Sequence, residues 1–483
     1  MRYTALAFDY DGTLAKDGAV APAVVEALRR VKDSGRKLLI VSGRVLSDLQ
    51  AVFEHLDLFE KVVVENGAVV YTPETGETRL LTDPAPQALV EELDRIGAKP
   101  SVGMSIVATW TPFETPTLEA IQKLGLEHTV IFNKGAVMVL PSGVNKATGL
   151  KCALDDLGLS AHNVIAVGDA ENDHAMLSLC EFGVAVSNAL PAVKERADFV
   201  TQGDHGDGII ELCNRVLASD LMELAPARHQ LVIGLTKETQ DNLAVSTFGP
   251  RILACGSLKS DLSEALLQKL AAQNYQLCII DPRGRHQGAG AAHRQWPAHS
   301  SQEPLRQSIL LGTIDSAPSL EEVSQALTMP ENNLMVNLSA LRDKERAEYF
   351  EEMLAAFAEK GAGSGRPHWV AVQDLHEFLP VAEQALVSNA PPTMLMTMDG
   401  THLSATHPEV LRLADVFIAT GENAFELTHA FADLTGRPRP HIRRADLQVG
   451  QALVWLMETA EPPVVAELDM PGDPLYSNVA NWV

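Results

Sequence analysis

Two carboxylates stand two residues apart in the stretch "FDYDGTL" near the start of the chain. Asp9 and Asp11 follow the short apolar run "ALAF", and Gly12 allows a sharp turn where that run ends. If the run is a parallel strand, both side chains lie at its carboxyl end, where doubly wound sheets place their active sites. One carboxylate can then attack a substrate while the other moves a proton. The alternative is that an isolated Asp-x-Asp pair at a strand end simply faces water.

Further polar motifs follow at the ends of later apolar runs. Taken alone, a lysine at a helix start would be a solvated cation, and an asparagine near a helix start would be a cap. Their occurrence in a fixed order is what favours a shared site. The residues are Ser42, Gly43 and Arg44 in "VSGR", Lys146 in "GVNKATG", and Asp169, Asn172 and Asp173 in "VGDAEND".

The elements that must position these residues alternate between short apolar strands and amphipathic helices. This rhythm predicts an α/β fold, a doubly wound parallel sheet, for a core of residues 1–67 and 141–223. Between those segments, residues 68–140 change to hairpins mixed with helices, which predicts an inserted α+β cap. Residues 224–483 begin a second α/β pattern, so we expect a second domain there.

The four motifs, in this order, resemble those of the haloacid dehalogenase (HAD) superfamily of phosphotransferases. The resemblance covers nearly all of residues 1–215, and a cap placed between the second and third motifs resembles subclass IIB of that superfamily. It implies a Rossmann-like core and a phosphatase that is Mg²⁺-dependent and works through an aspartyl-phosphate.

The resemblance also implies a role for each motif residue. Asp9 would be the nucleophile and Asp11 the acid and base. The phosphoryl oxygens and substrate would be held by Ser42, Gly43, Arg44, Lys146 and Asn172, and the metal by Asp9, Asp11 through its backbone carbonyl, Asp169 and Asp173. A phosphate dianion repels a carboxylate nucleophile, so a hard cation and a lysine at this place make chemical sense.

The expected substrate is a small phosphorylated metabolite. The short cap resembles that of archaeal-type phosphoglycolate phosphatases and of sugar-phosphate phosphatases, and sucrose-phosphate and mannosyl-phosphoglycerate phosphatases are further relatives. A phosphomutase of the same superfamily is an alternative. A different class of function, a non-catalytic scaffold or a nucleotide-sensing regulatory protein, also stays open.

The second domain contains a near match to a phosphate-binding loop. In "GSLKSDLS", Gly256 and Ser263 fit the pattern GxxxxGK[ST], but Asp261 and Leu262 stand where Gly and Lys belong. The setting resembles P-loop ATPases, in which a later strand ends in Asp-Glu rather than the Gln373-Asp374 found here. We therefore expect a degenerate, non-hydrolytic P-loop NTPase-like domain, with Asp261 capping the following helix and Glu264 completing a capping box.

Composition bounds the partners. The 483 residues carry 38 Lys and Arg against 63 Asp and Glu, a net charge of −25, which disfavours nucleic acid and anionic membranes. Five widely spaced cysteines and an N-terminus without signal-peptide features lead us to expect a cytoplasmic protein without disulfides. A protein partner or an anion ligand is possible at the second domain. His286, His293 and His299 lie in a Gly-rich stretch at spacings unlike those of metal ligands, so we interpret them as loop residues.

Overall fold

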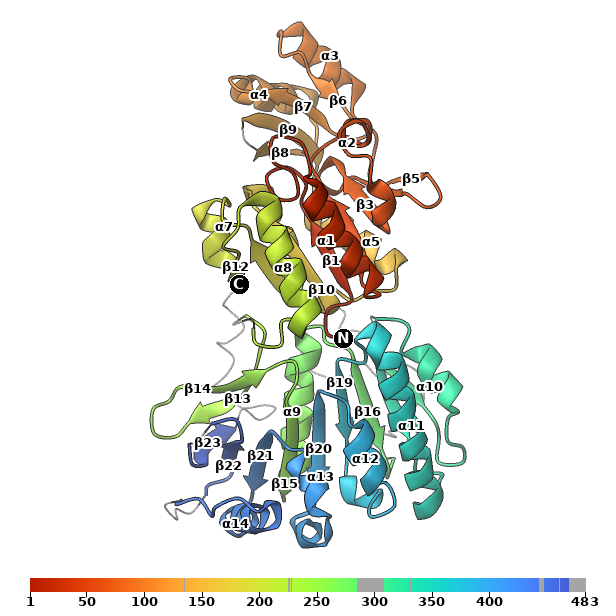
Figure 1. Ribbon diagram of the computed structural model, residues 1–483, viewed down its shortest axis with the longest axis vertical. Coiled ribbons are helices and arrows are strands. Elements are labelled where there is room, and N and C mark those ends of the chain that lie inside the picture. Colours follow the sequence, from red (N-terminus) through yellow and green to blue (C-terminus); the bar gives the residue numbers. More distant parts are fainter. Residues whose placement is uncertain are drawn as a thin grey trace. The chain divides into compact units, whose positions relative to one another are not determined.

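The computed structural model describes residues 1–483 except 134, 225, 227, 285–307, 331, 443–446, 460 and 469–483. The chain divides into two compact units, Met1–Pro226 and Ala227–Val483, each built around a large sheet (Figure 1). The three histidines expected in a loop, His286, His293 and His299, lie outside the described residues. Within the described residues, none of the helices has the length and apolar character needed to cross a membrane.

The first unit has an eight-stranded sheet whose centre is parallel. Strand β1 (Ala5–Phe8) lies between β10 and β2 and is parallel to both. Every residue of β1 is fully buried, as expected for a parallel strand covered on both faces. The sheet order is β12 (Phe199–Val200), β11 (Phe182–Ala185), β10 (Val164–Gly168), β1, β2 (Lys37–Val41), β3 (Lys61–Val64), β4 (Val69–Thr72) and β5 (Glu77–Leu80).

Two pairs of helices flank this sheet. Helix α1 (Pro22–Asp33) begins with proline at its first turn and buries residues at helical spacing, so one stripe of it faces the core. It packs against α8 (His205–Ser219), whereas α5 (Lys146–Asp156) contacts α6 (His174–Leu179). Figure 1 shows α1 and α8 in front of the strands and α5 behind them. Two further short helices of this unit are α2 (Leu46–Val52) and α7 (Pro191–Arg196).

A four-stranded antiparallel sheet forms the cap. The hairpin β4–β5 is not part of it, because β4 pairs with β3 and continues the core sheet. The cap sheet has the order β6 (Ser101–Val102), β7 (Val107–Trp110), β9 (Ala136–Pro141) and β8 (His128–Asn133). Helices α3 (Gln87–Arg95) and α4 (Glu114–Leu124) pack on it through a small apolar core that includes Leu89, Leu93, Val107, Ile121 and Val139.

The second unit has an eleven-stranded mixed sheet. Seven strands are parallel, and from one edge to the other they are β21 (Val416–Thr420), β15 (Arg251–Gly256), β20 (Met394–Met398), β19 (Trp369–Val372), β16 (Leu277–Asp281), β18 (Asn333–Asn337) and β17 (Ser308–Leu311). Antiparallel strands continue the sheet beyond β21 in the order β22 (Gln451–Leu456), β23 (Val464–Leu468), β13 (Gln230–Thr236) and β14 (Asn242–Ser246).

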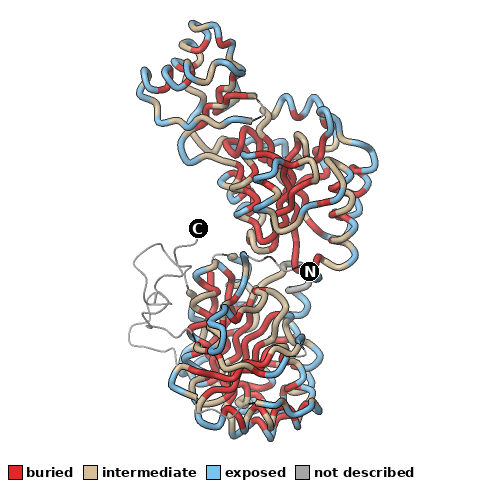
Figure 2. The backbone as a smooth tube through the Cα atoms, turned by 90° about the vertical axis from the view of Figure 1, so that its left-hand side faces the viewer, coloured by how far each residue is buried: buried red, intermediate tan, exposed pale blue. Residues whose placement is uncertain are grey.

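Alternate residues of these strands feed two apolar cores. Ile252 and Ala254 of β15 belong to the core that contains α9 (Lys259–Ala272), whereas Leu253 and Cys255 belong to the core on the other face. That second core includes residues of α11 (Asp343–Ser364), α12 (Glu383–Asn389), α13 (Pro408–Arg412) and α14 (Ala424–Thr435). A short helix α10 (Leu320–Ala326) also contributes Val323. Figure 2 shows that the buried residues concentrate in the interior of each unit.

The prediction that Asp261 caps α9 is wrong. The helix begins at Lys259 with Leu258 as its N-cap, and no side chain caps it. Asp261 therefore lies within the first turn. The apolar face fixes this frame, because Leu262 and Leu266 must be buried against the sheet. All five cysteines are free thiols, as expected.

Candidate active site

The first unit brings a buried lysine between two buried aspartates. Asp9 directly follows β1, and Lys146 is the first residue of α5. The Lys146 Nζ donates to Asp9 Oδ1 at 2.5 Å and to Asp173 Oδ1 at 2.6 Å. All three side chains are at most 6% exposed, so these charges depend on one another rather than on water.

Asp173 lies in a short 3₁₀ turn, η4 (Glu171–Asp173), after β10. Its Oδ2 accepts from the backbone amides of Asp169 and Ala170 at 2.9 and 3.0 Å. Gly168 makes this approach possible, since a Cβ there would lie 2.5 Å from the Asp173 side chain. Asp173 therefore fixes the loop that carries Asp169 and also holds Lys146.

Burial and neighbouring charge set the ionisation of this cluster. Burial raises the pKa of Asp9 to about 8, against the lowering effect of Lys146. For Lys146, burial lowers the pKa, but the charges of Asp173 and Asp9 outweigh that effect and hold it above its usual range. Lys146 thus stays charged, and any further cation at the site would favour the ionised form of Asp9.

Asp11 lies in a bidentate ion pair with Arg44. The guanidinium Nε and Nη2 donate to the two carboxylate oxygens of Asp11, each at 2.7 Å, and this pair raises the pKa of Arg44. Ser42 is fully buried after β2, and its Oγ accepts from the Arg44 amide at 3.1 Å. Gly43 lies against Asn66, because a Cβ on Gly43 would be 3.2 Å from Asn66 Oδ1.

Two neighbours of the site were missed by the sequence reasoning. Asn66 follows β3, and its Oδ1 accepts a hydrogen bond from Asn172 Nδ2 at 2.8 Å. This bond links the predicted residue Asn172, which follows β10, to the segment after β3. Glu65 precedes Asn66, is 1% exposed, and both residues have positive φ angles of 53° and 52°. The available sequence signal was the stretch "ENG" at the end of a strand. Residues other than glycine keep a positive φ angle only where other contacts compensate for the strain.

Glu65 holds the cap to the core. Its carboxylate accepts from the backbone amides of Met104, Ser105 and Ile106 at 2.8, 2.9 and 3.1 Å. These amides belong to the turn between β6 and β7 of the cap. A buried carboxylate that satisfies three amides is a strong, orientation-specific contact.

Oxygen atoms dominate the candidate metal ligands. Carboxylate oxygens of Asp9, Asp169 and Asp173 lie within 4.8 Å of one another, and all three residues are buried. Thr13 Oγ1 is 3.5 Å from Asp169 Oδ1. A buried all-oxygen donor set fits a hard cation such as Mg²⁺, which also prefers to keep several waters. The sequence-predicted residues Asp9, Lys146, Asp169 and Asp173 thus form one cluster, and Asp11, Ser42, Gly43, Arg44 and Asn172 lie around it.

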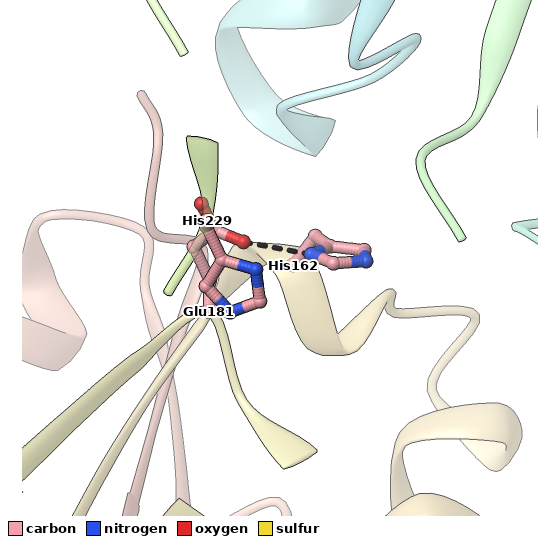
Figure 3. A group of neighbouring side chains, drawn as sticks. All are labelled: His162, Glu181 and His229. Atoms are coloured by element: carbon pink, nitrogen blue, oxygen red, sulfur yellow. Dashed lines mark hydrogen bonds and ion pairs between the residues drawn. The ribbon is translucent and has the colours of Figure 1, made fainter. Parts of the chain in front are cut away.

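A second polar group lies at the opposite end of the strands of the same sheet, at their amino ends. His162 Nδ1 is 2.7 Å from Glu181 Oε2 (Figure 3), and the Arg2 guanidinium donates to Glu181 Oε1 at 3.2 Å. These residues precede β10, β11 and β1, so they join the amino ends of the strands. The group therefore stabilises the sheet away from the active site.

Comparison with known proteins agrees with this geometry. Residues 6–108 and 114–212 match the haloacid dehalogenase-like hydrolase family. The chain belongs to this family through its first unit.

Two relatives and one solved structure are similar to the first unit. Phosphoglycolate phosphatase of Natronomonas pharaonis is 33% identical over 221 residues, which are 44% of this chain and 96% of that protein. Phosphoglycolate phosphatase of Methanothermobacter thermautotrophicus is 30% identical over 223 residues, 44% of this chain and 98% of that protein. A haloacid dehalogenase-like hydrolase structure from Bacteroides thetaiotaomicron covers 44% of this chain and 99% of its own, with 20% identity and a TM-score of 0.39. The prediction of a phosphatase of the HAD superfamily is confirmed by the family match and these relatives.

Proposed function

We propose that the first unit hydrolyses phosphomonoesters of small metabolites through an aspartyl-phosphate on Asp9, with Mg²⁺ as cofactor. The observation that carries this proposal is the buried cluster in which Lys146 bonds both Asp9 and Asp173 beside Asp169. A structural ion pair would need one carboxylate per lysine, whereas this cluster gathers three carboxylates around one cation. The excess negative charge favours a metal ion.

The two half-reactions assign a task to each group. In the first, a carboxylate oxygen of Asp9 attacks phosphorus and the ester oxygen leaves with a proton from Asp11. In the second, Asp11 takes a proton from water, which attacks the same phosphorus and releases Asp9 and inorganic phosphate. Lys146 and the Ser42 hydroxyl would hold the phosphoryl oxygens. Mg²⁺, held by Asp9 and Asp169 with the Asp11 carbonyl while Asp173 orients the loop, would neutralise the phosphoryl charge.

Arg44 would connect substrate binding to acid catalysis. Both Asp11 oxygens accept from Arg44, so this pair must open before Asp11 can give a proton to the leaving group. An incoming phosphate ester offers the guanidinium a second anion. We infer that Arg44 moves to the substrate and thereby releases Asp11.

The substrate class follows from the relatives and the cap. Both named relatives are phosphoglycolate phosphatases. The four-stranded cap contacts the core at Glu65, which follows β3. We infer a phosphoglycolate-like or sugar-phosphate substrate.

For the second unit, we infer a P-loop-like domain that does not hydrolyse nucleotides. Strand β15, a short loop and α9 follow one another as in such a fold, and parallel strands lie on both sides of β15. Leu262 is buried in the core where the pattern needs lysine. Lys259, the first residue of α9, instead contacts the carboxylates of Asp374 and Asp399. Nucleotide titrations of the full chain followed by calorimetry test this inference, and ATP hydrolysis that survives Asp9→Asn would contradict it.

A panel of phosphate esters, assayed for phosphate release with Mg²⁺ and with EDTA, tests the proposed activity. Asp9→Asn should lower kcat by roughly 10⁴-fold or more, as loss of a covalent nucleophile does. Asp17→Asn is a matched control, because Asp17 is exposed on the same loop. Activity that survives Asp9→Asn, or that EDTA leaves intact, would refute the mechanism. Transfer of phosphate to a second sugar position without release would indicate a phosphomutase.

A further inference from the structure

A second group of metal-ligating side chains lies in the second unit, at the carboxyl ends of two neighbouring parallel strands. His376 lies in η5 (Leu375–Glu377), which follows β19. Asp399 and His402 follow β20, with Asp399 at the start of η6 (Gly400–Ala405). Because β19 and β20 are neighbouring parallel strands, the segments that follow them lie side by side at the carboxyl ends of the strands.

The spacing of the ligand atoms is that of a shared metal ion. One ligand atom from each of His376, Asp399 and His402 lies within 4.8 Å of the others. His376 Nε2 is 3.5 Å from Asp399 Oδ2, which is long for a hydrogen bond. Two ligands of a tetrahedral Zn²⁺, each at its usual bond length, lie about 3.3 Å apart. The pair is therefore spaced for a common ion more than for direct contact.

The two imidazoles lie face to face, so one ring must turn before both can direct a nitrogen lone pair at one ion. Their rings stack with centroids 4.1 Å apart at 17°. Thr401 Oγ1 is 3.2 Å from His402 Nδ1, which leaves the other ring nitrogen of His402 for a ligand. The His376 side chain is 6% exposed, and its Nδ1 has no hydrogen-bond partner among the described residues. This nitrogen is not the one that faces Asp399, so no hydrogen bond at Nδ1 opposes a rotation of the ring that would direct Nε2 at an ion shared with Asp399.

The charges around the cluster decide between an ion pair network and a metal site. Lys259 bonds Asp399 Oδ1 and so leaves Oδ2 for a further cation. Arg283 Nη2 is 3.2 Å from His376 Nε2, and Arg283 also bonds Glu377, so it can release the histidine and keep a carboxylate partner. Four carboxylates and three cations meet here, a balance of −1, given by Asp343, Asp374, Glu377, Asp399, Lys259, Arg283 and Arg346.

We propose that His376, Asp399 and His402 bind one divalent transition-metal ion of the Zn²⁺ class. Imidazole nitrogens select such ions over Mg²⁺, whereas the all-oxygen cluster of the first unit selects Mg²⁺. Three protein ligands leave the fourth position of a tetrahedral ion to water. That position can reach solvent, because Asp399 is 39% exposed and His402 is exposed.

The test uses the full chain, stripped with EDTA, freed of chelator and kept in millimolar Mg²⁺ so that the all-oxygen cluster is occupied. Zn²⁺ is titrated by calorimetry, and Co²⁺ by its visible absorption, which is intense when four-coordinate. The wild-type chain should bind one ion. His402→Gln should weaken binding at least tenfold, and because this side chain is exposed the variant should fold normally.

His407→Gln is the matched control, since His407 is an exposed histidine on the following segment outside the cluster. It should bind Zn²⁺ as the wild-type chain does. Equal binding by the wild-type chain and His402→Gln would overturn the proposal, as would equal weakening in His407→Gln, which would indicate scattered surface histidines. Asp169→Asn should leave Zn²⁺ binding unchanged, and a loss there would place the ion in the first unit instead.

Discussion

The Lys146 ammonium lies 2.5 Å from Asp9 Oδ1, and neither side chain is more than 6% exposed. A charge pair so deeply buried offsets its own desolvation only while both members are present. The same lysine also contacts Asp173, so its removal would leave two carboxylates without a cation. This relationship makes the candidate active site a contributor to the stability of the core.

Lys146→Gln should therefore lower the free energy of unfolding by about 3 kcal/mol or more in EDTA. Added Mg²⁺ should recover part of this loss, because it can neutralise the same carboxylates. Urea unfolding followed by circular dichroism measures both effects. Lys151→Gln, on the exposed side of the same helix, is the control and should change stability little. If the two variants unfold alike, the buried cluster contributes nothing to stability.

Glu65→Gln should loosen the cap. The neutral amide cannot accept from three backbone amides as the carboxylate does, so the free energy of unfolding should fall by about 1–3 kcal/mol. Hydrogen exchange should quicken at Met104, Ser105 and Ile106 before it changes in the core strands. Glu119→Gln, exposed on α4, should leave these amides protected. Unchanged protection in Glu65→Gln would mean that the cap is held in another way.

Gly67→Ala should disrupt the positioning of α5. A Cβ at Gly67 would lie 2.0 Å from the carbonyl oxygen of Asn145, directly before Lys146, and the φ angle is +105°. We expect a loss of about 3 kcal/mol or more in unfolding free energy. Gly76→Ala also has positive φ but no atom within 4 Å, so it should cost only about 1 kcal/mol. Thermal or urea unfolding of both variants separates close contact from backbone strain, and equal losses would refute the contact argument.

Arg44→Met should lower kcat/KM by about 10- to 100-fold, because the guanidinium that leaves Asp11 is the group we expect to bind the phosphate ester. Its effect on stability should be within about 1 kcal/mol, since both partners are partly exposed. Steady-state kinetics with an aryl phosphate measure the first effect. Arg29→Met, exposed on α1, should retain full activity. An Arg44→Met enzyme with unchanged kcat/KM would limit Arg44 to a structural role.

Much of the site could be predicted because its residues stand where regular elements begin or end. Asp9 and Asp169 follow buried parallel strands, and Lys146 starts a helix. Topology alone therefore brings these residues to the carboxyl ends of the strands. The Arg44–Asp11 pair could not be foreseen, since it depends on side-chain rotamers across two loops. Glu65 and Asn66 were missed because their role rests on consecutive positive φ angles and on contacts with distant residues.

The start of α9 shows a local signal overridden by packing. Asp261 followed by Glu264 is typical of a capped helix, yet the N-cap is Leu258, three residues earlier. A helix capped by Asp261 would lack the observed first turn of α9. In that turn Lys259 is buried and contacts the residues that follow β19 and β20. Charge and apolar contacts at the sheet edge thus set the boundary.

Among the described residues of the cap, the Glu65 carboxylate accepts hydrogen bonds only from main-chain amides. Any hairpin that offers three successive amides at the same angle would satisfy it. A chimera with a different cap could therefore keep this contact with the core, but it would have to replace contacts through cap side chains, such as that of Asn66 Nδ2 with Met138 Sδ. Substrate preference and reaction chemistry can in this way diverge separately within one chain.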